Sequence, residues 1–333
     1  MYLVVDNFGA FVKKKSNRFL VSYGDKSEEF CADDVSQILI LKGSAISTDS
    51  MALAAEKGID IVIVDNVGRP LARVYPCRLG GTTLTRRRQL EAYFSNKGMF
   101  IVKAFLKAKI ENQAYLLRAL GKSRENKELE EKAKYISGVV TKIENIEGKR
   151  IDDIREKLLG IEGEASRVYF QVLGKILPSN LYTGARIKRP PGDAFNALLG
   201  YGYGILYSEV EKACIISGLD PYLGFLHTDR YGKPSMALDL IEEFRQPIID
   251  RAMITLIQRK MIDEKDVEKE GNGVYLNKNG RSKAIEAVVE RFNTAISYKK
   301  EKITLLDIIL KQARSLVKFL NENEKYEPFI YKW

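Results

Sequence analysis

A single histidine and two acidic residues that follow it are the side chains of this sequence best suited to chemistry. His227 is the only histidine, which excludes a histidine-rich metal site. Asp239 and Glu242 lie three residues apart in a stretch without Gly or Pro, so on a helix they share one face. A carboxylate is costly to bury unless it is paired or binds a metal ion. The spacing therefore predicts a divalent-ion site, although acids favoured by the dipole of a helix N-terminus would give the same pattern.

The residues after Glu242 predict which carboxylate points inward. If the helix bends at Pro247 and continues, apolar residues follow Glu242 at the three- and four-residue spacing of a buried face. Glu243 falls on a different side of the helix and is expected to be more easily solvated. We therefore predict that replacing Glu242 removes activity, whereas replacing Glu243 largely spares it. The apolar residues are Ile249, Met253 and Leu256.

A second acidic pair lies far upstream in a predicted helix, and its first member, Glu162, lies between Gly160 and Gly163. Glu162 shares its helical face with Ala165 and Tyr169, whereas Glu164 shares its face with Arg167. Because apolar residues at this spacing mark the buried side of a helix, Glu162 is expected to face inward and Glu164 outward. Glu162 is therefore a second candidate ligand from a distant part of the chain.

The charge of the chain indicates the kind of partner. It has a formal net charge of +10 over 333 residues, which favours polyanions, nucleic acid first among them. Three basic clusters in separate places predict a surface that follows a phosphate backbone, and for the cluster at 86–88 a solvated face is the alternative. The candidate DNA-binding residues are Arg86, Arg87, Arg88, Arg186, Lys188, Arg189, Arg230, Lys233, Arg245, Lys311 and Arg314.

The cysteines and the N-terminal residues bear on the cellular compartment. Cys31, Cys77 and Cys214 are odd in number and far apart, so neither a disulfide framework nor a Cys-x-x-Cys metal site is expected. No basic region followed by a long apolar run begins the chain, so we expect neither a signal peptide nor a membrane span. The composition is typical of a cytoplasmic protein.

The pattern of elements predicts an α+β protein of two domains. Short β-branched and aromatic runs, separated by Asn and Gly, predict an N-terminal antiparallel β-sandwich over residues 1–80. Residues 81–333 read as a larger all-helical domain, and residues 265–282 as a mobile excursion or a small hairpin around Tyr275. Helices are predicted over 86–120, 128–146, 151–177, 195–218, 237–261 and 305–321.

Several motifs, taken in order, resemble one known family. They are LGIEG at 159–163, RPPGD at 189–193, GYG at 200–202, GFLH at 224–227 and ALDLIEEFR at 237–245. At these residues the chain resembles the CRISPR-associated protein one family, the metal-dependent DNA integrase and endonuclease of spacer acquisition. The resemblance covers essentially the whole chain, including the order of a β domain before a helical one.

The resemblance implies a site and partners. It maps a metal site to Glu162, His227 and Glu242, which would be the catalytic residues. Asp239 matches a further acidic position, either a ligand or a residue that supports one, and Asn196 is a second candidate for a supporting role. The expected partners are DNA (protospacer fragments and the CRISPR repeat), a second copy of the chain bound through the β domain, and CRISPR-associated protein two as a bridging dimer.

Two carboxylates and one imidazole suit Mn²⁺ or Mg²⁺, with positions open for phosphate and water. The main hypothesis is therefore the insertion of short DNA fragments as new spacers into a CRISPR array. The alternatives are a metal-dependent nuclease that cleaves branched or single-stranded DNA, and a non-enzymatic basic scaffold that binds DNA. Metal-dependent turnover separates the scaffold from both enzymes, and covalent joining separates integrase from nuclease.

Overall fold

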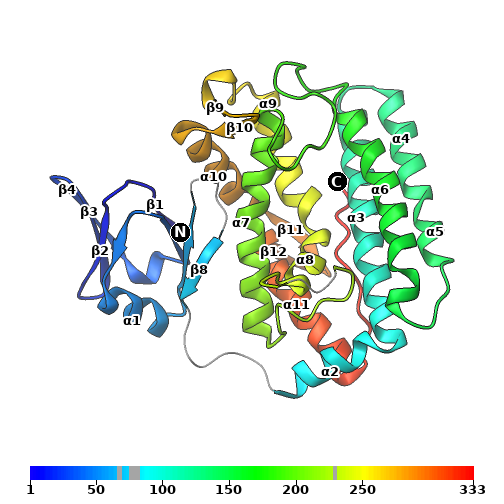
Figure 1. Ribbon diagram of the computed structural model, residues 1–333, viewed down its shortest axis with the longest axis horizontal. Helices are drawn as coiled ribbons and strands as arrows, with labels where there is room; N and C mark the ends of the chain where they lie inside the picture. The colour runs from blue at the N-terminus through cyan, green and yellow to red at the C-terminus, as the bar shows by residue number, and fades with distance from the viewer. Residues whose placement is uncertain (66–69, 75–82, 228–230) are drawn as a thin grey trace. The chain divides into compact units, whose positions relative to one another are not determined.

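The structure is a computed structural model that describes residues 1–65, 70–74, 83–227 and 231–333. The chain forms two compact units, Met1–Leu79 and Gly80–Trp333. The first unit consists mainly of strands, whereas the second is mostly helical (Figure 1). The predicted fold class, a β domain followed by a larger helical domain, is confirmed.

Two four-stranded sheets make up the first unit. One has the strand order β1-β5-β7-β8 and the other β4-β3-β2-β6, and a helix, α1, precedes β7 in the chain. The strands of the first sheet are β1 (Tyr2–Val5), β5 (Gln37–Leu41), β7 (Asp60–Val64) and β8 (Pro70–Val74). Those of the second are β2 (Phe11–Lys15), β3 (Arg18–Tyr23), β4 (Lys26–Cys31) and β6 (Ala45–Ile46), and α1 spans Thr48–Glu56.

The expectation of a purely antiparallel sandwich is wrong. Strands β1, β5 and β7 run parallel to one another, and β2 and β6 are also parallel. The signal was in the sequence, because β5 and β7 read QILIL and DIVIV and are buried along most of their length. Near-continuous apolar runs are typical of parallel strands covered on both faces, whereas antiparallel strands with one wet face alternate.

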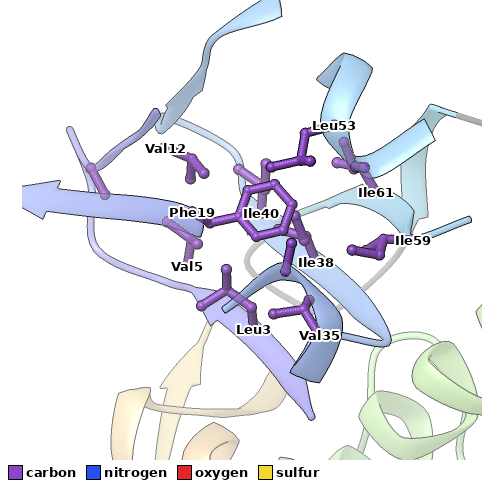
Figure 2. Close-up of a cluster of buried hydrophobic side chains, with 13 residues drawn as sticks. Leu3, Val5, Val12, Phe19, Val35, Ile38, Ile40, Leu53, Ile59 and Ile61 are labelled. Atoms are coloured by element: carbon purple, nitrogen blue, oxygen red, sulfur yellow. The ribbon is translucent and has the colours of Figure 1, made fainter. Parts of the chain in front are cut away.

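Both sheets and α1 contribute to one hydrophobic core. Figure 2 shows Leu3 and Ile38 of the first sheet beside Val12 and Phe19 of the second, with Leu53 from α1. Each of these side chains is almost completely buried. Burying apolar area in this way contributes roughly 25 cal/mol per Å², so the unit has its own source of stability.

The second unit contains most of the helices, and three of the predicted helices, 86–120, 128–146 and 237–261, are divided. The expected helix 86–120 is interrupted near Ser95, whose side chain accepts a hydrogen bond from the Lys97 N–H and caps the next helix. The helices are α2 (Thr83–Tyr93), α3 (Asn96–Lys122), α4 (Lys127–Gly138), α5 (Val140–Glu144), α6 (Ile151–Leu173), α7 (Ala194–Ser217), α8 (Ser235–Leu240), α9 (Arg251–Gln258), α10 (Lys278–Phe292) and α11 (Leu305–Glu322).

Two hairpins also lie in this unit. The predicted hairpin around Tyr275 is present as β9 (Val267–Glu270) and β10 (Gly273–Leu276), which pair antiparallel. A second hairpin, β11 (Ala295–Tyr298) and β12 (Glu301–Thr304), and helix α10 were not predicted. Among the helices of the described ranges, none is long and apolar enough to cross a membrane.

The stretch predicted as one kinked helix, 237–261, changes helix type three times. Helix α8 ends at Leu240, a 3₁₀ turn covers Ile241–Glu243, a π-helix covers Arg245–Asp250, and α9 follows. Pro247 lies inside the π-helix, where its missing N–H removes a regular helical hydrogen bond. A tightened turn beside a widened one alters the angular phase of side chains. This change in phase determines the directions in which the side chains of adjacent residues in the turn point.

Helix α3 is the element around which the site is assembled. It packs against both α6 and the 3₁₀ turn. In Figure 1 it lies beside α4 and α6, and α8 lies beside α7. Segments far apart in the sequence therefore meet along the middle of α3.

Candidate active site

Glu162 and Glu242 lie on either side of a lysine that the sequence analysis did not single out. The Nζ atom of Lys109, on α3, is 2.6 Å from Oε1 of Glu162 on α6. It is 2.7 Å from Oε2 of Glu242 in the 3₁₀ turn. Lys109 keeps only 14% of its side chain exposed, and Glu242 only 5%. Two carboxylates from distant parts of the chain thus share one buried cation.

The signal for Lys109 was its position along α3. It is four residues after Phe105 and four before Gln113, both of which are buried, so it lies on the inward face of a long helix. A lysine on such a face requires a negative partner. The sequence could have revealed that Lys109 needs a negatively charged partner, but not which carboxylates are its partners.

Hydrogen bonds orient the Glu162 carboxylate. The hydroxyl of Ser166, one turn later on α6, donates to Oε1 of Glu162 at 2.6 Å, and Gln113 of α3 donates to that hydroxyl at 3.0 Å. Glu164, in contrast, accepts hydrogen bonds from Tyr135 and Lys142 at the exposed side of the helix. These positions agree with the predicted difference in phase between the two glutamates.

Asp239 fixes the orientation of His227. The Asp239 carboxylate, fully buried, accepts hydrogen bonds from the backbone N–H groups of Phe225, Leu226 and His227 at 2.6, 2.9 and 3.0 Å. The same Oδ1 atom lies 2.6 Å from Nδ1 of His227. Since an ionised carboxylate can only accept, Nδ1 carries the hydrogen and Nε2 is the nitrogen left with a lone pair. Asp239 therefore contacts His227 and its loop. Of the two roles predicted for Asp239, metal ligand or support of a ligand, these contacts fit the second.

The loop that carries His227 is also held from its carbonyl side. Arg155, two turns before Glu162 on α6, donates from Nε to the Leu226 carbonyl at 3.0 Å and from Nη2 to the Phe225 carbonyl at 3.3 Å. Asp239 binds the N–H groups of the same loop while Arg155 binds its C=O groups. One helix thus positions both Glu162 and the backbone beside His227.

Neighbouring cations keep Glu242 ionised in spite of its burial. Loss of solvent acts to raise the pKa of Glu242, but the neighbouring cations, Arg245 first and then Lys109, lower it to about 2. The Nε atom of Arg245 is 3.1 Å from Oε2 of Glu242. That oxygen nevertheless receives no hydrogen bond of regular geometry within the described part of the chain. For Glu162, burial acts to raise the pKa and Lys109 outweighs it, so this pKa is lowered too.

The prediction that Glu243 is more easily solvated is wrong. Glu243 is completely buried and accepts hydrogen bonds from the Tyr326 hydroxyl and, at 2.9 Å, from the Phe329 N–H. Both partners belong to the C-terminal segment 323–333, which follows α11. The change from α-helix to a 3₁₀ turn at Ile241 removes the phase on which the prediction depended, so both glutamates point into the protein in different directions.

The donor set fits a divalent ion in its chemistry. It offers two ionised carboxylates, one of them with an oxygen that lacks a regular hydrogen bond, and an imidazole nitrogen with a free lone pair. Carboxylate oxygens and imidazole nitrogen together suit Mn²⁺ or Mg²⁺. Over the described ranges, however, no three His, Cys, Asp or Glu side chains are arranged to hold an ion, and Lys109 stands between the two carboxylates. The metal site therefore stays a prediction that requires Lys109 to move.

Comparison with known proteins identifies the family. The family model described as CRISPR associated protein Cas1 matches residues 3–290. This chain belongs to the Cas1 family. A CRISPR-associated endonuclease Cas1 of Archaeoglobus fulgidus is 37% identical over 347 aligned positions, which cover 100% of both proteins. The resemblance seen in the sequence motifs is confirmed.

Solved structures show the same fold. A casposase bound to an integration product superposes with a TM-score of 0.86 at 23% identity, covering 100% of this chain and 94% of that one. A chain of a Cas6-RT-Cas1–Cas2 complex superposes with a TM-score of 0.81 at 22% identity, covering 100% of this chain and 36% of that one. At these identities the similarity establishes the Cas1 fold alone.

The residues predicted to bind DNA differ in their exposure in this Cas1 protein. Arg186 and Arg245 point inward: Arg186 donates to Oδ1 of Asn196 at 2.8 Å, and the Arg245 guanidinium lies 4.6 Å from the Tyr203 ring centre. Lys233 is half-buried, and Arg230 lies outside the described residues. Binding of DNA by these side chains stays a prediction. The exposed members are Arg86, Arg87, Arg88, Lys188, Arg189, Lys311 and Arg314.

Asn196 lies in a network at the start of α7. Its amide donates to the Asp193 carboxylate and to the Ala185 carbonyl, and its Oδ1 accepts from Arg186 and from the Ile187 N–H. None of these contacts joins Glu162, His227 or Glu242. The contacts of Asn196 hold the basic segment 185–189 against α7.

Proposed function

We propose that this protein is a divalent-metal-dependent DNA endonuclease and integrase that inserts short DNA fragments into a CRISPR array as new spacers. The observation that carries the proposal is the convergence of Glu162 and Glu242 on one cation. His227, whose Nδ1 is held by Asp239, completes the donor set. Its relative in Archaeoglobus fulgidus is called an endonuclease, and the casposase of the same fold was bound to an integration product.

Glu162, Glu242 and Nε2 of His227 would hold Mn²⁺ or Mg²⁺. The bound ion would polarise the scissile phosphate and stabilise the charge that builds up in an in-line displacement. The attacking group in strand transfer is the 3′-hydroxyl of the inserted DNA, so the protein supplies position and charge and needs no nucleophilic side chain.

The other residues of the site prepare these ligands. Asp239 holds the hydrogen on Nδ1 of His227 and so presents Nε2 as the ligand atom, because the partner of one ring nitrogen selects the tautomer. Ser166 orients Oε1 of Glu162. Arg245 lowers the pKa of the buried Glu242 carboxyl against the effect of desolvation, which keeps this ligand ionised. Arg155 holds the carbonyl groups of the loop beside His227.

Several partners follow from this function. DNA fits the net charge of +10 and the exposed basic residues near positions 86–88 and 311–314. A second Cas1 chain bound through the β domain is expected from the family resemblance. CRISPR-associated protein two as a bridging dimer is in line with the Cas1–Cas2 complex in which one chain has this fold. The reaction would take place in the cytoplasm, where the array is.

One incubation tests the proposal. Purified protein and its partner would be mixed with a labelled DNA fragment, a repeat-bearing plasmid and Mn²⁺, and covalently joined product measured. Wild type should join the fragment only with metal. Glu162→Gln should lose on the order of 100-fold or more of the joining rate, because loss of a charged ligand removes several kcal/mol of stabilisation.

Glu164→Gln is the matched control, since Glu164 lies two residues away on the same helix and pairs with the exposed Lys142. It should join DNA at close to the wild-type rate. Metal-dependent cleavage without joining would replace the integrase by the nuclease. DNA binding without either reaction would favour the scaffold, and equal loss in the two variants would remove Glu162 from the site.

A further inference from the structure

Lys109 is a buried residue of the site for which the proposed ligand set has no use. Its ammonium contacts both of the carboxylates that would hold the ion, at 2.6 and 2.7 Å. It belongs to the middle of a 27-residue helix, α3, so its backbone is firmly placed. Only its flexible four-carbon side chain can move.

The lysine has a clear electrostatic role beside these carboxylates. Glu162 and Glu242 are both ionised and both mostly removed from water, and two like charges in that setting repel each other. One ammonium between them offsets this repulsion. Lys109 thus places a positive charge between the two carboxylates, and Arg245 adds a second one beside Glu242.

A divalent ion would need the same oxygen atoms. Bonds from carboxylate oxygen to Mg²⁺ measure about 2.0–2.1 Å, shorter than the present contacts of the ammonium, so the ion would occupy the same space between the two carboxylates. A dication at that place would also repel the Lys109 ammonium. The two cations therefore exclude each other from the space between Glu162 and Glu242.

We propose that Lys109 is an internal counter-ion that competes with the metal for Glu162 and Glu242 and is displaced when the metal binds. This inference rests on the proposed function, since it takes both glutamates as metal ligands. The ammonium stabilises the pair of carboxylates before the metal binds, and the same contacts weaken metal binding. The lysine side chain, with its freely rotating stem, then leaves the space between the two carboxylates.

Mn²⁺ affinity measured by isothermal titration calorimetry tests the competition directly. Lys109→Gln keeps hydrogen-bond donors but removes the charge, and it should bind Mn²⁺ at least about tenfold more tightly than wild type. Lys107→Gln is the control: Lys107 lies on the same helix, is 42% exposed and pairs with Glu144 at 2.7 Å. Its Mn²⁺ affinity should equal that of wild type.

A second measurement uses the wild-type protein and so does not depend on how the variant folds. Acylation of lysines by an amine-reactive reagent, read by mass spectrometry, should modify Lys109 slowly without Mn²⁺ and several-fold faster with it. Lys107 should be modified at the same rate in both conditions. The increase follows because displacement frees the ammonium from its two carboxylates.

The outcomes separate this inference from the proposed function. If wild type binds Mn²⁺ and Glu162→Gln weakens that binding, the metal site stands. In that case, unchanged Mn²⁺ affinity in Lys109→Gln, or a Lys109 that stays protected when Mn²⁺ is bound, overturns the competition alone. If neither wild type nor Lys109→Gln binds Mn²⁺, the proposed metal site fails as well.

Discussion

Glu242 and Glu243 are adjacent in the chain and both are buried, yet the surroundings of Glu242 lower the pKa of its carboxyl whereas those of Glu243 raise it. Glu242 faces Lys109 and Arg245, and its pKa is lowered to about 2 in spite of desolvation. Glu243 faces the C-terminal segment, and desolvation raises its pKa to about 8 although Tyr326 and Phe329 donate hydrogen bonds that oppose the rise.

The difference between these regions lies in the charge of the partners. A neighbouring cation stabilises the anion enough to outweigh the loss of water, whereas neutral donors do not. Helix α3 contributes to both sides: Lys109 contacts Glu242, and the Asn112 amide donates to the carbonyls of Glu243 and Phe329 at 2.9 and 3.0 Å. The 3₁₀ turn thus has an ionic side suited to chemistry and a neutral side that fastens the C-terminal segment.

The largest expected effect is on activity. Glu242→Gln should lower the rate of DNA joining by on the order of 1000-fold or more, because it removes a charged ligand of the proposed ion. Glu243→Gln should stay within about threefold of wild type. Its side chain is as neutral as the protonated acid, and its carbonyl oxygen can accept from the Phe329 N–H.

Glutamine is needed at position 243 because alanine would leave two buried donors without an acceptor, at a cost of about 1–3 kcal/mol each. The comparison of the two variants uses joining rates measured with Mn²⁺ and circular dichroism spectra that check folding. Equal loss of rate in both variants with intact folding would mean that the two sides of the turn are not functionally distinct.

The next largest effect is on the pH dependence of stability. The pKa of Glu243 is raised in the folded protein from 4.5 to about 8, so folding favours its protonated form. Its contribution is therefore fully present below pH 4.5 and is lost as the pH rises to about 8. The lowered pKa of Glu242 acts in the opposite direction and only below pH 4.5, where its contribution is lost on acidification.

Between about pH 5 and 8.5, wild type should accordingly lose stability relative to Glu243→Gln. The difference should reach a few kcal/mol, given about 1.4 kcal/mol for each unit of pKa shift. Urea unfolding of both proteins at several pH values measures it. Parallel curves for the two proteins across this range would show that Glu243 is not held neutral by the fold.

The smallest expected effect compares two tyrosines that donate to glutamates. Tyr326→Phe removes the buried hydroxyl that donates to Glu243 and should cost about 1 kcal/mol of unfolding free energy. Tyr135→Phe removes the exposed hydroxyl that donates to Glu164 and should cost less than about 0.5 kcal/mol. Thermal unfolding at one pH checks both. A larger loss at Tyr135 would contradict the view that burial sets the value of these contacts.

Local periodicity was sufficient wherever the backbone stayed regular. Helix α6 is uninterrupted from Ile151 to Leu173, so the phase that separated Glu162 from Glu164 agrees with the structure. The family motifs likewise identified the Cas1 family and the order of its two domains. Periodicity failed at Glu243, because the helix changes type just before it and phase cannot be carried across a 3₁₀ turn.

The sequence by itself determined many of the elements, the family and the candidate ligands, since these depend on residue type and on spacing within one segment. Only the tertiary structure decided that Lys109 lies between Glu162 and Glu242 and that Glu243 meets Tyr326. These pairs come from segments separated by 50 or more positions, and spacing within a segment carries no information about such distances. The energy of a buried charge depends on the distance and sign of its nearest partners, so the protonation of each carboxyl was settled only when the helices packed.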